Sequence, residues 1–227
     1  MGTANRFVGI DLGVRALHVV TLERSGARLR VADARIVTPD AIGDLAPVVE
    51  TARAVAIDAP AAPSRGCHTD DGSLAPKFRT ARCGEIALGR GAAIWVPWPT
   101  PTRTTDAPAW MQVGFTAWAT CRAHGPEPME VYPAGAFRVL AAGKVPPKST
   151  PAGLEARRRL LADTVEPPAG FAMWSHDGLD ATVAALTAAD AAEGAATAYG
   201  HTDPGCDPVA VWMPAGPADR GRTPEGR

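Results

Sequence analysis

The sequence contains few cysteines, and their spacing excludes the common cysteine-based scaffolds. Only four occur among 227 residues, at Cys67, Cys83, Cys121 and Cys206, and none forms a Cys-x-x-Cys pair. Cys67-His68 followed by Cys83 is the one hint of a zinc site, but a fourth ligand at regular spacing is missing. We therefore expect reduced thiols, as is usual in cytoplasmic proteins.

Long apolar runs are also absent. No segment is apolar over the roughly 20 residues that a membrane helix requires, and residues 1–6 carry no signal-peptide pattern. We expect a cytoplasmic protein that does not contact a membrane.

Neither sign of charge dominates, since 23 Lys and Arg face 24 Asp and Glu for a net charge of −1. This balance excludes a generally basic nucleic-acid coat protein, and 46% hydrophobic content excludes wholesale disorder. The neutrality nevertheless conceals a gradient. Residues 61–160 contain 13 basic and 7 acidic side chains, whereas residues 161–227 contain 3 and 10. The basic middle is suited to a short or transient phosphodiester substrate.

The apolar periodicity predicts a single α/β domain over residues 1–213, with an irregular insert at about 61–128 and a disordered tail at 214–227. We expect the first three strands to form an antiparallel meander. The predicted strands are 7–12, 16–23, 27–37, 54–58 and 129–132, with a last edge strand at 209–213. The predicted helices are 40–53, 77–89, 107–122, 134–142, 152–163 and, most clearly, 177–193.

Acidic residues stand at the ends of the predicted elements. Asp11 ends the first strand, Asp58 ends the fourth, and Asp177 and Asp180 share one face in the opening turn of the last helix. If the first and fourth strands are neighbours, these carboxylates lie together and raise one another's pKa unless a cation neutralises them. Hard oxygen ligands select Mg²⁺ or Mn²⁺, and two such ions could cleave a phosphodiester.

Each acidic residue also has a structural interpretation. Asp177 could be a helix N-cap, and Asp180 a first-turn acid that complements the helix dipole. Asp58 precedes Ala59-Pro60 and could be a turn residue. Residues that only cap helices or form turns do not need to meet at one edge of the sheet. The expected meeting of all four aspartates therefore favours a metal site.

Five short motifs, taken in chain order, resemble a known family. They are Gly9-Ile10-Asp11-Leu12-Gly13, Ile57-Asp58-Ala59-Pro60, Arg82-x-x-Glu85, Glu130-Val131-Tyr132-Pro133 and His176-Asp177-x-x-Asp180-Ala181. Together they resemble domain-of-unknown-function family four hundred and twenty-nine, predicted nucleases of the ribonuclease H-like fold, over residues 7–196. The last motif is similar to the helix start of RuvC-type resolvases. The resemblance implies a mixed five-stranded sheet, in which the antiparallel meander is joined by parallel strands, with helices on both faces. It also implies metal-dependent phosphodiester cleavage.

The resemblance also implies roles for single residues. Asp11 would bridge two metal ions, Asp58 and Asp180 would each complete one metal shell, and Asp177 and Glu130 would be further ligands or orienting groups. Three basic residues would bind the substrate: Arg82, Lys148 and Arg157. Arg82 and Glu85 could instead form a helix-surface ion pair, and Lys148 could belong to a solvated helix start. His176 could shuttle a proton or simply be a capping or packed histidine.

The sequence is also compatible with two other functions. Actin-like and sugar-kinase ATPases begin with a similar Gly9–Gly13 segment, but this chain is short for their paired domains and lacks a second glycine-rich adenosine motif. A non-catalytic binding protein could retain the same fold. Four tryptophans in the basic middle could stack on bases or fill the core of the insert: Trp95, Trp98, Trp110 and Trp118. The pattern favours a nuclease or other phosphodiester hydrolase that uses Mg²⁺ or Mn²⁺.

Overall fold

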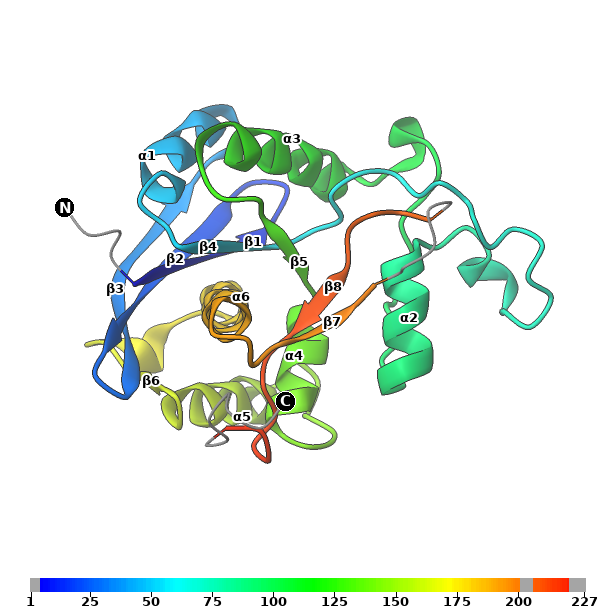
Figure 1. Cartoon of the computed structure of the whole chain (residues 1–227). Helices are drawn as coiled ribbons and strands as arrows, with labels where there is room; N and C mark the ends of the chain where they lie inside the picture. Colours follow the sequence, from blue (N-terminus) through cyan, green and yellow to red (C-terminus); the bar gives the residue numbers. More distant parts are fainter. Residues whose placement is uncertain (1–4, 201–205, 221–227) are drawn as a thin grey trace.

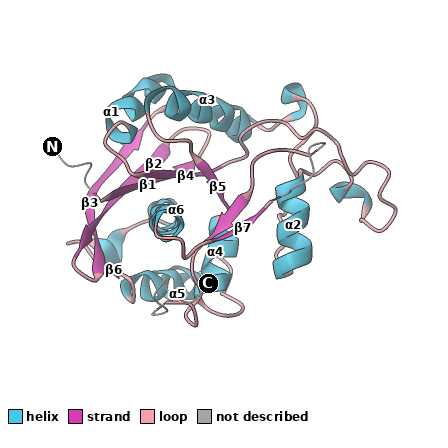
Figure 2. Ribbon diagram, viewed as in Figure 1, coloured by secondary structure: helices cyan, strands magenta, loops and turns pink. Residues whose placement is uncertain are grey.

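The fold is an eight-stranded mixed sheet covered by helices, seen in a computed structural model that describes residues 5–200 and 206–220 (Figures 1 and 2). The strand order is β6-β3-β2-β1-β4-β5-β8-β7. The strands are β1 (Arg6–Leu12), β2 (Leu17–Ser25), β3 (Arg28–Val37), β4 (Ala54–Asp58), β5 (Met129–Val131), β6 (Val165–Glu166), β7 (Thr197–Tyr199) and β8 (Val211–Met213).

The centre of the sheet follows the predicted arrangement. Strands β1, β2 and β3 form the antiparallel meander, with Gly26 at a positive φ in the turn between β2 and β3. Strand β4 pairs with β1 in parallel, and β5 pairs with β4 in parallel. The first and fourth strands are therefore neighbours, as the acidic pattern required.

The predicted number of five strands is wrong, because β6, β7 and β8 also join the sheet. Strand β8 lies between β5 and β7 and is not the edge strand that we expected. Each of these three strands has only two or three residues. The alternation of apolar and polar side chains that marks a strand cannot be recognised over two or three residues. These segments form strands only because they pair with neighbouring strands in the folded protein.

Helices lie on both faces of the sheet (Figure 1). Helices α4 (Pro133–Leu140), α5 (Pro151–Ala162) and α6 (His176–Ala192) lie on one face, and α1 (Ala46–Val49) and α3 (Ala109–His124) on the other. Helix α2 (Cys83–Ala92) stands beside the β7–β8 end. Four short 3₁₀ segments complete the helical elements: Pro39–Leu45, Pro76–Phe78, Thr104–Asp106 and Phe171–Met173. The helix predicted over 40–53 is thus a 3₁₀ segment followed by one turn of α1, which begins at Ala46 and has Pro47 in its first turn, where proline is well tolerated.

Helix α6 packs unusually close to the central strand β1. A Cβ atom on Gly9 would stand 2.1 Å from the Ala181 carbonyl oxygen and 2.2 Å from the Ala185 nitrogen. Only glycine in the strand and alanine in the helix allow this contact. Because α6 lies directly on β1, the opening turn of the helix is fixed beside the carboxyl end of the strand, where Asp11 stands.

The residues after β8 pack against α6 as far as they are described. Ala215 is buried and its backbone N–H donates to Asp190, which also pairs with Arg220 at 2.6 Å. These residues belong to the segment that we predicted as a disordered tail, and up to residue 220 they contact the domain. Residues 221–227 of that segment lie outside the described residues.

Two cysteines form a disulfide, which corrects the expectation of reduced thiols. Cys83 and Cys206 are bonded, with their Cα atoms 6.0 Å apart. Because 123 residues separate them, no local spacing could have revealed the pair.

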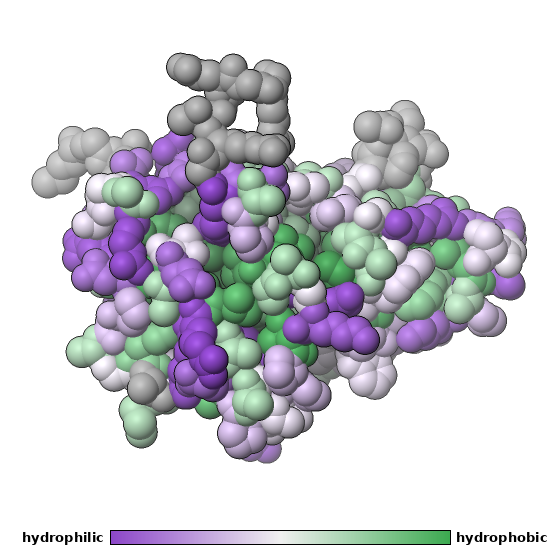
Figure 3. Space-filling model, turned by 90° about the horizontal axis from the view of Figure 1, so that it is seen from below, coloured by the Kyte–Doolittle hydropathy of each residue, from purple (hydrophilic) through white to green (hydrophobic). Residues whose placement is uncertain are grey.

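Among the described residues no helix combines the length and apolarity needed to cross a bilayer. On the face seen from below, hydrophobic residues gather near the middle between hydrophilic ones (Figure 3).

Candidate active site

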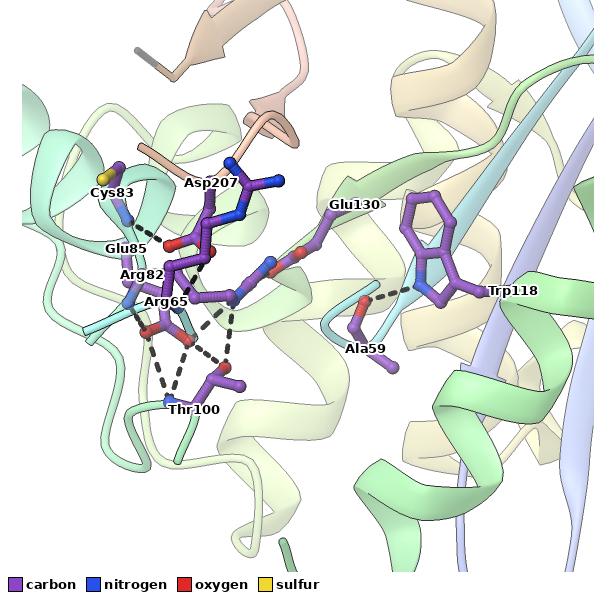
Figure 4. A network of polar contacts seen from close by, with 9 residues as sticks. All are labelled: Ala59, Arg65, Arg82, Cys83, Glu85, Thr100, Trp118, Glu130 and Asp207. Carbon is purple, nitrogen blue, oxygen red and sulfur yellow. Dashed lines mark hydrogen bonds and ion pairs between the residues drawn. The ribbon is translucent and has the colours of Figure 1, made fainter. Parts of the chain in front are cut away.

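Asp11 and Asp58 lie side by side at the carboxyl ends of β1 and β4. The two residues are direct partners in the parallel register, and a side-chain hydrogen bond links their carboxyl groups. Trp118 of α3 donates its Nε1 hydrogen to the Ala59 carbonyl at 3.0 Å, which fixes the turn that follows Asp58 (Figure 4). The strand-end pattern therefore predicted this pair correctly.

Asp180 approaches the pair from α6. Its side chain is buried, with the residue only 3% exposed, and its charge raises the pKa of both strand-end carboxyls. Ser175 caps the helix by accepting from the Gly178 N–H, so Asp177 is not the N-cap that the structural interpretation suggested. The only acidic residue in the first turn of α6 is Asp177, so Asp180, which is buried one turn further on, is also not the first-turn acid of the structural interpretation.

Asp177 lies at the exposed rim of this group. Its side chain is half exposed, and its carboxylate stands 3.8 Å from both Lys148 Nζ and His18 Nε2. His18 is the strand partner of Asp11 on β2. No local motif marks His18 in the sequence, because only the antiparallel register between β1 and β2 brings it to the site.

Lys148 is the counter-ion of the acidic group. Its ammonium stands 2.7 Å from Asp180 Oδ2 and its side chain is half exposed. Although burial opposes its charge, the nearby carboxylates of Asp180, Asp11 and Asp177 raise the pKa of Lys148 overall. Lys148, which we predicted to bind a substrate phosphate, thus places its ammonium beside Asp180, where a metal ion bound to this carboxylate would lie.

The carboxyl groups hold protons unusually tightly. Burial, followed by the charge of Asp180, raises the pKa of Asp11 to about 7. Burial and the charges of Asp11 and Asp180 raise the pKa of Asp58 well above its ordinary value. Burial also raises the pKa of Asp180, against the opposing charge of Lys148. A cluster of this kind is short of positive charge, which a divalent cation would supply.

These shifts predict how stability depends on pH. A carboxyl with a raised pKa in the folded state contributes stability below its unfolded value near 4, and this contribution is lost as the pH rises towards 7. Without divalent cations, we expect the unfolding free energy to fall from pH 5 to pH 8 by about 2–4 kcal/mol. Urea unfolding in chelator across this range measures it. A stability that rises steadily over the same range would contradict the assignment of raised pKa values.

Glu130 lies next to this group but belongs to a buried ion network. It accepts from Arg82 Nη2 in a close contact, and Arg82 Nε donates to Thr100 Oγ1 at 3.1 Å (Figure 4). Glu85 accepts from the Arg82 backbone N–H at 2.9 Å and from Thr100 Oγ1 at 2.6 Å. Burial raises the pKa of Glu130 to about 7 despite the opposing charge of Arg82.

Two of the three predicted substrate-binding residues are committed to internal contacts. Arg82 is 1% exposed, so it is neither open to substrate nor part of a surface ion pair with Glu85. Arg157 is also buried, donates to the Pro146 and Gly153 carbonyls, and covers the Phe137 ring. These contacts support structural roles for both arginines.

His176 lies at the start of α6 close to the acidic group. Burial, followed by the charge of Arg157, lowers the pKa of His176, and its buried Nδ1 has no hydrogen-bond partner among the described residues. The imidazole is therefore held neutral more readily than a solvent-exposed one.

A cavity of about 640 Å³ opens in front of the carboxylates. Its polar wall contains Asp11, Asp58, Asp177, Glu130 and Lys148, and its apolar wall contains Leu12, Val14, Pro60, Val96, Trp98, Trp110, Met111 and Tyr132.

Two of the four tryptophans line this cavity, and of the other two only Trp118 belongs to the core. Trp118 is buried, and Trp95 packs on Phe78 with ring centres 4.6 Å apart. Trp110 and Trp98 line the cavity, and Trp98 is 72% exposed. A flat apolar wall thus faces a carboxylate cluster.

Comparison with known proteins places the chain in one family. Residues 9–204 match a family described as "Protein of unknown function (DUF429)". No curated protein and no solved structure shows significant similarity to the chain.

Proposed function

The chain belongs to the DUF429 family, and we propose that it is a metal-dependent phosphodiester hydrolase with ribonuclease H-like architecture. The central order β3-β2-β1-β4-β5, with an antiparallel meander followed by parallel strands, supports this architecture. Fold alone does not define an activity, so the proposal depends on the carboxylate cluster.

The observation that carries the proposal is the meeting of Asp11, Asp58 and Asp180. Two come from aligned ends of parallel strands and the third from a helix locked onto the same strand. All three donate hard oxygen atoms, and a lysine ammonium already neutralises one of them. This donor set fits Mg²⁺ or Mn²⁺. The three carboxylates do not all lie within 4.8 Å of one another in the described chain, which favours two neighbouring positions that share Asp11.

The residues around the cluster would divide the remaining work. A bound divalent ion supplies Lewis acidity and a water of lowered pKa. Asp11 would hold such an ion with Asp58 at one position and with Asp180 at the other, while Lys148 would turn from Asp180 towards a substrate phosphate. Trp98 and Trp110 offer flat faces to the organic part of the substrate, as base-stacking aromatics do. A nucleic acid is thus a suitable substrate class, and a small phosphodiester would use the same carboxylates.

Cleavage assays test this proposal directly. The purified chain is incubated with single- and double-stranded DNA, RNA and bis(p-nitrophenyl) phosphate, with Mn²⁺, with Mg²⁺ or with chelator. We expect turnover only with a divalent ion and its loss in Asp58→Asn, while the surface variant Asp44→Asn stays active. Activity that persists in chelator or in Asp58→Asn would place the chemistry elsewhere. A melting temperature raised by ATP would instead favour the ATPase class.

Substitution of Lys148 separates competition for Asp180 from substrate binding. Lys148→Met removes the ammonium from Asp180, so we expect Mn²⁺ to bind about three- to tenfold more tightly, as fits a half-exposed pair. Calorimetric titration measures the affinity, and Lys144→Met on the same loop is the matched control. Weaker Mn²⁺ binding in Lys148→Met would show that the lysine shapes the site and does not compete with the ion.

A further inference from the structure

Three cysteines from distant parts of the chain meet beside α2. The sulfur atoms of Cys67, Cys83 and Cys206 all lie within 4.8 Å of one another. Cys67 comes from the exposed loop of the insert, Cys83 is the first residue of α2, and Cys206 precedes β8. Cys83 and Cys206 are joined by the disulfide, and Cys67 Sγ lies within 4.8 Å of both of their sulfur atoms.

Hydrogen bonds between side chains and backbone groups connect the three segments independently of the sulfur atoms. Asp207 accepts from the Cys83 N–H at 3.3 Å and from the Arg65 N–H at 3.0 Å (Figure 4). The Arg65 side chain also donates to the Cys206 carbonyl at 3.0 Å. Asp207 is buried. The segments that carry Cys67, Cys83 and Cys206 are therefore clamped in place, so breaking the disulfide leaves three thiols close together.

We propose that Cys67, Cys83 and Cys206, once reduced, form a binding site for a thiophilic divalent ion such as Zn²⁺. Sulfur ligands at about 2.3 Å from a tetrahedral zinc lie about 3.8 Å apart, which the present spacing allows. A dithiol reductant supplies two electrons and two protons to open the disulfide and is itself oxidised to a disulfide, and the three protein thiols release their protons when the ion binds. A solvent molecule at exposed Cys67 can occupy the fourth position.

This site differs in chemistry and place from the carboxylate cluster. Thiolates select zinc or cobalt, whereas the aspartates select Mg²⁺ or Mn²⁺. Cys83 follows Arg82 directly, so an ion bound here would anchor the arginine that neutralises Glu130. The sequence showed only Cys67-His68 and Cys83, and the third sulfur comes from a residue 123 positions beyond Cys83.

Cobalt binding tests the proposal, because thiolate-to-cobalt charge-transfer absorption does not arise from carboxylates. Reduced full-length protein is titrated with Co²⁺ and then with Zn²⁺. We expect one cobalt per chain with charge-transfer bands, which Zn²⁺ removes. Cys67→Ser should weaken binding at least about tenfold. Since Cys67 is exposed, this variant should still fold. Cys121→Ala changes the one buried cysteine outside the cluster and is the matched control.

Melting temperatures in reductant provide a second measurement. Zn²⁺ should raise the value for the parent protein and for Asp11→Asn, but not for Cys67→Ser. Absence of charge-transfer bands in the reduced parent protein, or their retention in Cys67→Ser, would overturn the proposal. Because Asp11→Asn keeps the thiols, the outcome does not depend on phosphodiester cleavage.

Discussion

Asp11→Asn should abolish metal-dependent cleavage and, in chelator at pH 8, make the protein more stable. The loss of activity follows because Asp11, the strand partner of Asp58 and a residue that feels the charge of Asp180, is the carboxylate that both proposed metal positions would share. We expect turnover to fall by at least about a hundredfold, beyond what is typical for groups that only orient a metal ligand. Steady-state cleavage with saturating Mn²⁺ measures this effect.

The gain in stability has a separate cause. Burial and the charge of Asp180 raise the pKa of Asp11 to about 7. At pH 8 Asp11 is therefore ionised in the folded protein, and this buried negative charge lowers the free energy of unfolding. Asparagine removes this charge at almost constant shape. The difference between a pKa of about 7 and the ordinary value of 3.8 corresponds to about 4 kcal/mol in the free energy of unfolding. Because Asp11 and Asp58 titrate together, we expect Asp11→Asn to recover about 2–4 kcal/mol of this free energy.

Urea unfolding in chelator at pH 5 and pH 8 checks the second effect. The advantage of Asp11→Asn over the parent protein should grow with pH, because the parent carboxyl is protonated at pH 5. Asp44→Asn removes an exposed carboxylate and should show no such trend. If Asp11→Asn were active, or were less stable than the parent at pH 8, the cluster would not be a strained cation site. Activity lost together with stability gained distinguishes a functional carboxylate from a structural one.

The sequence predicted those parts of the site that depend on element ends. An apolar strand that closes on an aspartate is visible in Gly9–Leu12 and in 54–58, and the parallel pairing of two such strands brings Asp11 and Asp58 together. The helical pattern of the alanine-rich α6 is equally clear in the sequence, because it continues over 17 residues, which is more than four helical turns. In each case the local pattern and the tertiary arrangement agree.

Long-range pairing explains what the sequence did not reveal. His18 reaches the site through strand register alone, and Cys206 reaches Cys83 across 123 residues. Arg82 in an irregular insert carries no periodicity that would predict its burial, so a phosphate-binding role was as reasonable as a structural one. Only the position of Thr100 and Glu130 around it decides between them.

Arg82→Met should be among the most destabilising single substitutions in the protein. The guanidinium is 1% exposed and neutralises Glu130 and Glu85, which are themselves buried. Removing one partner of a buried ion pair leaves an uncompensated charge and typically costs about 3–5 kcal/mol. Lysine would not restore the network, since a single ammonium cannot contact Thr100 and both carboxylates in the same geometry. Urea unfolding at pH 8 measures the loss.

The double variant Arg82→Met/Glu130→Gln identifies the cause of that loss. If the penalty comes from the stranded carboxylate of Glu130, the added glutamine should recover about half of it or more. The penalty of Arg82→Met alone should also be smaller at pH 5, where Glu130, whose pKa burial already raises to about 7, takes up a proton. A penalty that is independent of pH and additive with Glu130→Gln would indicate lost packing and not charge. Because Glu130 on β5 pairs with Ile57, the neighbour of Asp58, relaxation of this network would reach the carboxylate cluster through the strand that carries it.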